Sequence, residues 1–170
     1  MPAGHDKPAD AGGDPMAARV SLPSDHTILI VRAFAAPCAV VFDAWTRSEQ
    51  VAQWWDPRRQ PLAICEIDLS PNGRFRFVTQ GLDGAAHPFA GRYREIVPPT
   101  RLVFTSQVAL NGPPSVGTLV FEEHGGTTTL TMTIECASRA DRDMLLKMRV
   151  DAGTMRTLDN LAHYLRRRRP

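Results

Sequence analysis

Residues 138–166 read SRADRDMLLKMRVDAGTMRTLDNLAHYLR, and this stretch decides the fold. It begins with a capping box, in which Ser138 is the N-cap and Asp141 is the third helical residue. Apolar residues then follow at steps of three and four, namely Met144, Met148, Ala152, Met155, Leu158, Ala162 and Leu165. This spacing predicts one continuous helix of about seven turns and about 40 Å. An apolar stripe of that length needs an equally long partner.

The chain before this helix is made mostly of strand-like runs, so we expect the partner to be a sheet. A β-branched run, TILIVRAF at 27–34, predicts the first strand. Two short helices are expected next, over 37–45 and 49–54, because Pro37 suits a first helical turn and Asp56-Pro57 ends the second helix. Further strands are expected at hairpin spacing, over 62–69, 74–80, 89–97, 101–108, 116–123 and 127–135.

The order of these elements predicts the fold class. Strands and helices do not alternate, so the class is α+β, with a curved antiparallel sheet of about seven strands around a long C-terminal helix. Residues 1–24 are rich in Ala, Gly, Pro and Asp without periodicity, which predicts a disordered leader. Residues 25–165 are predicted to form one domain, and residues 166–170 a solvated basic tail.

Composition restricts the function classes. The hydrophobic fraction of 43% and charged fraction of 22% are typical of globular proteins, and a net charge of +2 gives no reason to expect nucleic acid. There is no apolar run long enough for a membrane span. Three widely separated cysteines, Cys38, Cys65 and Cys136, predict free thiols in the cytoplasm rather than a zinc site.

Three stretches of the chain carry a family resemblance. The first contains RAFAAP at 32–37, VFDAWT at 41–46 and then Trp54-Trp55. The second contains Asp68-Leu69, PNGRF at 71–75, GRYREI at 91–96 and PTRL at 99–102. The third is GTMRTLDNL at 153–161. Together they resemble START-like and Bet v 1-like proteins of the SRPBCC superfamily, and most closely the branch named after the activator of heat-shock protein 90 ATPase.

The resemblance implies a helix-grip fold, in which the sheet wraps around the C-terminal helix and leaves a cavity between them. It covers residues 25–165, so these are predicted to form a START-like helix-grip domain. The chain departs from the family pattern at two positions. Asn72 stands where members often have a glycine, and Thr154 stands where many have a tryptophan. The second departure removes a bulky wall from the expected cavity.

The resemblance makes ten residues candidates for the cavity lining. They are Trp54, Trp55, Phe75, Phe77, Tyr93, Phe104, Met132, Met148, Gly153 and Met155. The alternative is that these residues form plain hydrophobic core. We expect one of the two tryptophans in the core and the other at the cavity mouth. Gly153 costs a helix about 1 kcal/mol relative to alanine, which indicates a close approach by a strand or a ligand, with a strand favoured.

The sequence contains no catalytic, phosphate-binding or dinucleotide-binding motif and no metal-ligand spacing. We therefore predict no catalytic residue, no cofactor and no metal. Together with this absence, the resemblance implies non-catalytic binding of a small hydrophobic or amphipathic molecule in the cavity. Two alternatives stay open. One is a cyclase- or aromatase-type enzyme with Glu95 or Arg32 as polar candidates, and the other is a co-chaperone-like module for heat-shock protein 90. A homodimer is also left open.

Overall fold

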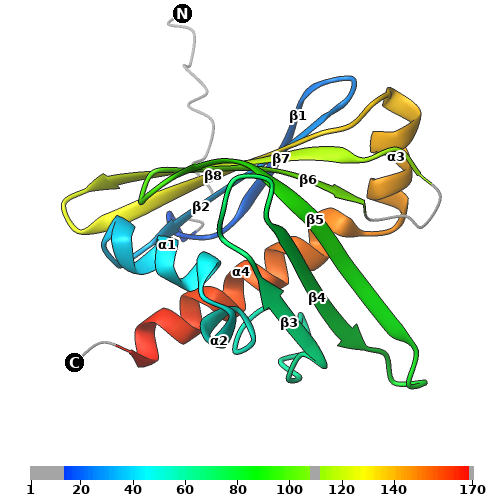
Figure 1. Ribbon diagram of the computed structural model, residues 1–170. Helices are drawn as coiled ribbons and strands as arrows, with labels where there is room; N and C mark the ends of the chain where they lie inside the picture. The colour runs from blue at the N-terminus through cyan, green and yellow to red at the C-terminus, as the bar shows by residue number, and fades with distance from the viewer. Residues whose placement is uncertain (1–13, 108–111, 169–170) are drawn as a thin grey trace, which may run out of the picture.

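The computed structural model describes residues 14–107 and 112–168, and it contains one curved antiparallel sheet (Figure 1). The strand order is β1-β2-β8-β7-β6-β5-β4-β3. The strands are β1 (Arg19–Ser24), β2 (Thr27–Phe34), β3 (Ile64–Ile67), β4 (Arg74–Gln80), β5 (Ala86–Val97), β6 (Arg101–Gln107), β7 (Ser115–His124) and β8 (Thr127–Glu135). The helices are α1 (Cys38–Thr46), α2 (Ser48–Val51), α3 (Arg139–Lys147) and α4 (Val150–Arg167).

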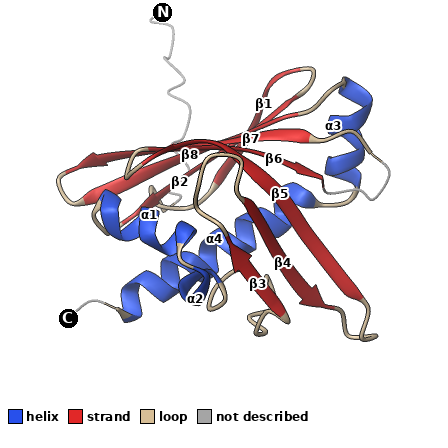
Figure 2. Cartoon of the chain, in the orientation of Figure 1, coloured by secondary structure: helices blue, strands red, loops and turns tan. Residues whose placement is uncertain are grey.

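The α+β helix-grip prediction is confirmed. Figure 2 shows α1, α2 and α4 on one side of the sheet, which curls so that α4 lies within its curve. The strands expected over 27–34, 74–80 and 127–135 form with those bounds as β2, β4 and β8. Residue 108, expected at the end of β6, lies outside the described residues.

The sheet has one strand more than expected. Residues 19–24 were predicted to belong to a disordered leader, but Arg19–Ser24 forms β1 and pairs antiparallel with β2. The prediction was wrong there because β1 is an edge strand with mostly exposed side chains, and its alternation is limited to Val20 and Leu22 and is interrupted by Pro23. Residues 1–13 of the predicted leader lie outside the described residues.

The single long helix is also corrected. Its N-terminus is as predicted, because the Ser138 hydroxyl accepts a hydrogen bond of 3.1 Å from the Asp141 amide. The helix then breaks at Arg149, whose left-handed backbone (φ 59°, ψ 34°) separates α3 from α4. The apolar spacing runs from Met144 and Met148 across this break into α4, yet the side chains of these two methionines are 45% and 49% exposed. The spacing alone could not reveal the break.

The core lies where the C-terminal half of α4 meets the inner face of the sheet. Leu158, Leu161 and Leu165 of α4 are at most 7% exposed and belong to one cluster with Ile30 and Leu130 of the central strands. Arg32, which is buried on β2, donates a hydrogen bond to the Asp159 carboxylate on α4. This half of α4 therefore packs directly on the sheet.

Two glycines lie in opposite surroundings. A Cβ atom on Gly117 of β7 would lie 2.5 Å from the Phe104 ring, because that ring lies across the glycine. A Cβ atom on Gly153 of α4 would meet no atom within 4 Å. Within the described structure no strand therefore approaches Gly153 closely, and the expectation of such a neighbour was wrong.

These surroundings predict stability changes of opposite sign. Gly117→Ala should lower the free energy of unfolding by about 1–3 kcal/mol, since the added methyl group overpacks the Phe104 ring. Gly153→Ala should raise it by about 0.5–1 kcal/mol, because alanine is the better helix former and the methyl group has room. Urea denaturation of both variants would measure the changes. A destabilised Gly153→Ala protein would contradict the open space beside α4.

Candidate functional site

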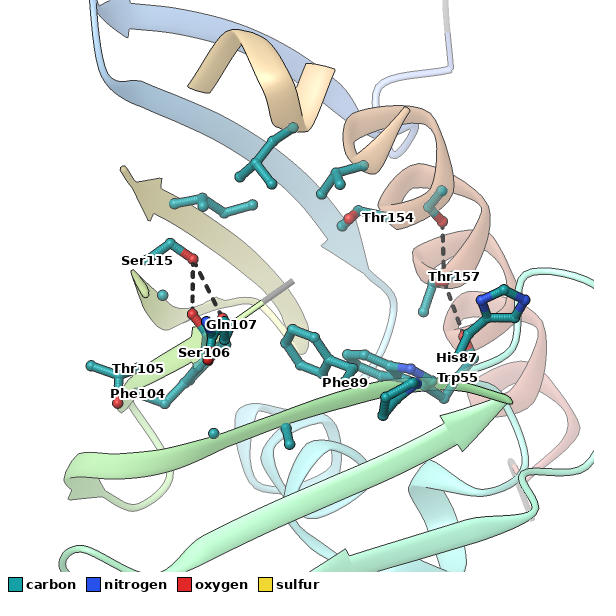
Figure 3. A pocket seen from close by; sticks show the side chains of 18 of the residues that line it. Trp55, His87, Phe89, Phe104, Thr105, Ser106, Gln107, Ser115, Thr154 and Thr157 are labelled. Carbon is teal, nitrogen blue, oxygen red and sulfur yellow. Dashed lines mark hydrogen bonds between the residues drawn. The ribbon is translucent and has the colours of Figure 1, made fainter. Parts of the chain in front are cut away.

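A cavity of about 1140 Å³ lies between the sheet and the N-terminal half of α4 (Figure 3). Its walls come from strands β4 to β8, from the α3–α4 region and from the segment after α2. The volume is at the upper end of the range of small-molecule sites in proteins. No helix in the described ranges combines the length and apolarity that crossing a membrane requires.

The cavity exists because small residues face each other across it. Gly91 of β5 is paired with Ser106 of β6, which is paired in turn with Ser115 of β7. Directly opposite residues in an antiparallel sheet share a face, so these three side chains form one row on the cavity wall. The facing turn of α4 carries Gly153 and Thr154, which also line the cavity. A Cβ atom on Gly91 would lie 2.6 Å from the Phe75 ring, so that ring covers this glycine, and the two serines, Gly153 and Thr154 are the small residues that border the open space.

One end of the cavity is aromatic. The Trp55 ring stacks on the Phe89 ring, with a centroid distance of 5.2 Å and an interplanar angle of 27°. The Phe77 ring contacts Trp55 edge-on at 4.8 Å, and the Trp45 ring does so at 6.0 Å. The flat surfaces of Trp55 and Phe89 are therefore held in position by neighbouring rings.

The segment that carries Trp55 is fastened to α4 by side-chain hydrogen bonds. The Thr157 hydroxyl donates to the Trp55 carbonyl at 3.1 Å, and the Asn160 amide donates to the Asp56 carbonyl at 2.8 Å. The Arg59 guanidinium donates to the Asn160 side-chain oxygen at 3.0 Å. Asn160 thus joins two points of the loop to the helix. The helix that forms one wall also positions the aromatic end.

The other end of the cavity carries hydroxyl groups. The Ser106 and Ser115 hydroxyl oxygens lie 3.4 Å apart, and the Ser115 hydroxyl also approaches the Ser106 carbonyl at 3.5 Å (Figure 3). Both serines are buried, with exposed fractions of 5% and 7%. Hydrogen bonds between oxygens are usually about 2.7–2.8 Å long, so both contacts are weak.

Five of the ten predicted lining residues contact the cavity. They are Trp55, Phe104, Met132, Met148 and Gly153. Trp54, Phe75, Phe77 and Tyr93 are instead buried in the core, and Met155 is half-buried outside the lining. The core aromatics pack on one another, as Phe75 does on Tyr93 at 5.3 Å. Their sequence spacing placed them on the inner face but could not show which rings have empty space in front of them.

The two adjacent tryptophans differ as expected in burial. Trp54 is 1% exposed and donates its indole N–H to the Ala44 carbonyl at 3.0 Å. Trp55 is only partly buried and lines the cavity. Whether Trp55 gates the mouth stays a prediction.

Several lining residues were missed by sequence reasoning, chiefly Phe89, Ser106, Ser115 and Thr157. Phe89 could have been found, because it alternates with Gly91 and Tyr93 along one strand. The serines and the threonine carried no such signal. They are polar residues whose burial depends on how three strands and one helix align.

The charged groups of the site are few. No carboxylate lines the cavity among the residues that the structure describes, and the lining histidine, His87, is exposed. Of the two polar candidates, Glu95 forms an exposed ion pair with Arg101 at 3.2 Å, and Arg32 pairs with Asp159 outside the lining. Burial raises the pKa of Tyr93 above its usual value, so its phenol stays neutral behind the cavity wall.

The described residues contain no cluster of three or more His, Cys, Asp or Glu side chains that would hold a metal ion.

The resemblance to known proteins is consistent with this cavity-centred architecture. A family model described as Activator of Hsp90 ATPase homolog 1-like protein matches residues 35–166, which include every residue of the cavity lining. The chain belongs to this family.

Solved structures agree with the membership of this family and of the SRPBCC superfamily. A crystal structure of a Rhodobacter sphaeroides protein has a TM-score of 0.82 and 22% identity, over 89% of this chain and 99% of that chain. A Mycobacterium smegmatis protein has a TM-score of 0.79 and 25% identity, over 89% and 98%. A Rhizobium leguminosarum protein has a TM-score of 0.65 and 27% identity, over 89% and 97%. No curated protein matches the chain.

The contacts of Asn160 predict how the aromatic end depends on α4. Asn160→Ala should destabilise the protein by about 1–3 kcal/mol, because two hydrogen bonds are lost, the one to the Asp56 carbonyl and the one from the Arg59 guanidinium, while the Asp56 carbonyl keeps its 2.8 Å hydrogen bond from the Arg59 amide. It should also speed amide hydrogen exchange in residues 52–60, as followed by mass spectrometry. Arg156→Ala, at an exposed position of the same helix, is the control and should change neither quantity. Unchanged exchange in the Asn160 variant would contradict the fastening described above.

Proposed function

We propose that this protein binds a small apolar or amphipathic molecule in the cavity between the sheet and α4. The observation that supports this most strongly is the set of small residues on both walls, Ser106 and Ser115 on the sheet and Gly153 and Thr154 on α4. The cavity of about 1140 Å³ opens to solvent, and exposed residues such as His87 and Met148 are part of its lining. An apolar molecule that entered it would remove apolar lining surface, such as that of Trp55 and Phe89, from water, which favours binding.

The same cavity favours binding over the two alternatives. A cyclase- or aromatase-type enzyme needs an acid or base against the bound substrate. Apart from two arginines, the exposed His87 is the only side chain of that kind among the described lining residues. A co-chaperone-like module would need a protein-binding surface and would have no use for a large internal volume. The proposal keeps the cytoplasm as the location, which the free Cys38, Cys65 and Cys136 support.

Thr154 allows a direct test of the proposed site. Thr154→Trp should fill part of the cavity and weaken binding of N-phenyl-1-naphthylamine at least tenfold. This neutral probe fluoresces more strongly in apolar surroundings, so a fluorescence titration gives its Kd directly. The physical reason is steric, because the indole would occupy the space that the probe needs.

Arg156→Trp is the matched control for this test. It adds the same indole to the same helix at an exposed position, and the probe should bind it as it binds the unmodified protein. Equal binding by both variants and the unmodified protein would place the probe elsewhere on the surface. No binding by the unmodified protein would count against the proposed function itself.

A further inference from the structure

The two buried serines of the cavity are poorly satisfied as hydrogen-bonding groups. Their mutual contact of 3.4 Å and the contact of 3.5 Å with the Ser106 carbonyl are each well beyond the usual length. A buried hydroxyl without a good partner costs about 1–3 kcal/mol. Each serine can donate one hydrogen bond and accept two, so the pair has unused capacity of both kinds. A group that entered the cavity beside them could form shorter bonds to both.

A third hydroxyl faces the same space from the opposite wall. Thr154 of α4 lines the cavity, and Figure 3 shows it across from Ser115 of β7. Within the described part of the chain, the Thr154 hydroxyl forms no hydrogen bond. The Thr157 hydroxyl, by contrast, is already bonded to the Trp55 and Gly153 carbonyls. Free hydroxyls on both walls therefore accompany the small residues that make the cavity.

The charge of the lining limits which polar group can enter. Arg74 and Arg92 are directly paired, and each alternates with a buried residue of the inner face, Phe75 or Tyr93. Both residues belong to the cavity lining, but they are exposed and the alternation directs their guanidinium groups to the convex face of the sheet, where that of Arg92 donates to the Asn72 carbonyl at 2.9 Å. An ionised head group beside the serines would therefore be buried without a counter-charge, which costs several kcal/mol. A neutral group carries no such cost.

The sheet register gives the length of the ligand. Phe89 lies two residues from Gly91 along β5, and Ser115 lies two strands away from Gly91. Strand geometry then places the Phe89 and Ser115 Cα atoms about 12 Å apart. The stacked Trp55 and Phe89 rings offer flat apolar surfaces at one end of this span, and the serines offer hydroxyls at the other.

We propose that the cavity selects an elongated, uncharged molecule with a planar apolar body and a hydroxyl or carbonyl group at one end. The body lies against Trp55 and Phe89, and the polar group bonds to Ser106 and Ser115. This inference rests on the proposed binding function and adds the chemical class of the ligand. The serines act as specificity-determining residues, because they set which polar group is accepted and leave the apolar body unaffected.

Three compounds with the same biphenyl body test this proposal. Biphenyl has no polar group, 4-phenylphenol has a neutral hydroxyl, and biphenyl-4-carboxylate is anionic at pH 7. Each would compete with N-phenyl-1-naphthylamine for the protein in a fluorescence displacement titration. Biphenyl is the most hydrophobic of the three, so without specific polar contacts it should bind most tightly. We expect 4-phenylphenol to bind about tenfold more tightly than either of the others.

Variants assign this preference to the serines. Ser106→Ala combined with Ser115→Ala should abolish the preference for 4-phenylphenol over biphenyl while biphenyl keeps its affinity. Ser106→Ala alone should reduce the preference, and it serves if the double variant does not fold. Thr118→Ala, on the convex face of β7, is the control and should keep the full preference.

The outcomes separate this inference from the function on which it rests. If biphenyl displaces the probe as well as 4-phenylphenol does, or if the serine variants keep the preference, the assignment of the polar end is overturned and the binding function stands. Tightest binding by biphenyl-4-carboxylate would overturn the requirement for an uncharged head group. If the probe does not bind the unmodified protein, both proposals fail together.

Discussion

The structure depends on the packing of Leu158, Leu161 and Leu165 against the inner face of the sheet. These side chains are almost fully buried and fix the C-terminal half of α4 to the central strands. The ion pair between Arg32 and Asp159 joins the same helix to β2. With that half fixed, the path of the N-terminal half follows from helix rigidity rather than from contacts of its own. It lies over the part of the sheet that borders the cavity.

The size of the sheet residues decides whether their side chains reach the helix there. Ser106 and Ser115 lie where larger side chains would otherwise reach the helix, and Gly153 and Thr154 are the small residues on the helix side. Arg149 contributes by ending the helical path, so that α3 departs from the line of α4. The C-terminal half of α4 therefore packs directly on the sheet, whereas its N-terminal half borders the cavity. The proposed function and ligand class both follow from this division.

The sequence predicted the fold better than the site, for physical reasons. Strands such as β8 alternate apolar and polar residues, and the leucines of α4 repeat with helical spacing, so local pattern was enough to place them. The break at Arg149 left no periodic signal, and the alternation of Val20 and Leu22 in the edge strand β1 was too short to predict a strand. For the cavity, Phe75 and Trp55 looked alike in sequence, although one fills the core and the other borders empty space. Empty space is a property of the whole packing arrangement.

The central claim is that the cavity admits a small molecule, and the three tryptophans test it within one experiment. Trp45 and Trp55 line the cavity, whereas Trp54 is buried with its indole N–H bonded to Ala44. Each tryptophan gives one indole signal in a ¹⁵N–¹H correlation spectrum. On titration with 4-phenylphenol, we predict that the Trp45 and Trp55 signals shift in a saturable manner and the Trp54 signal shifts much less. If all three signals stay in place while the compound is in excess, the account is contradicted.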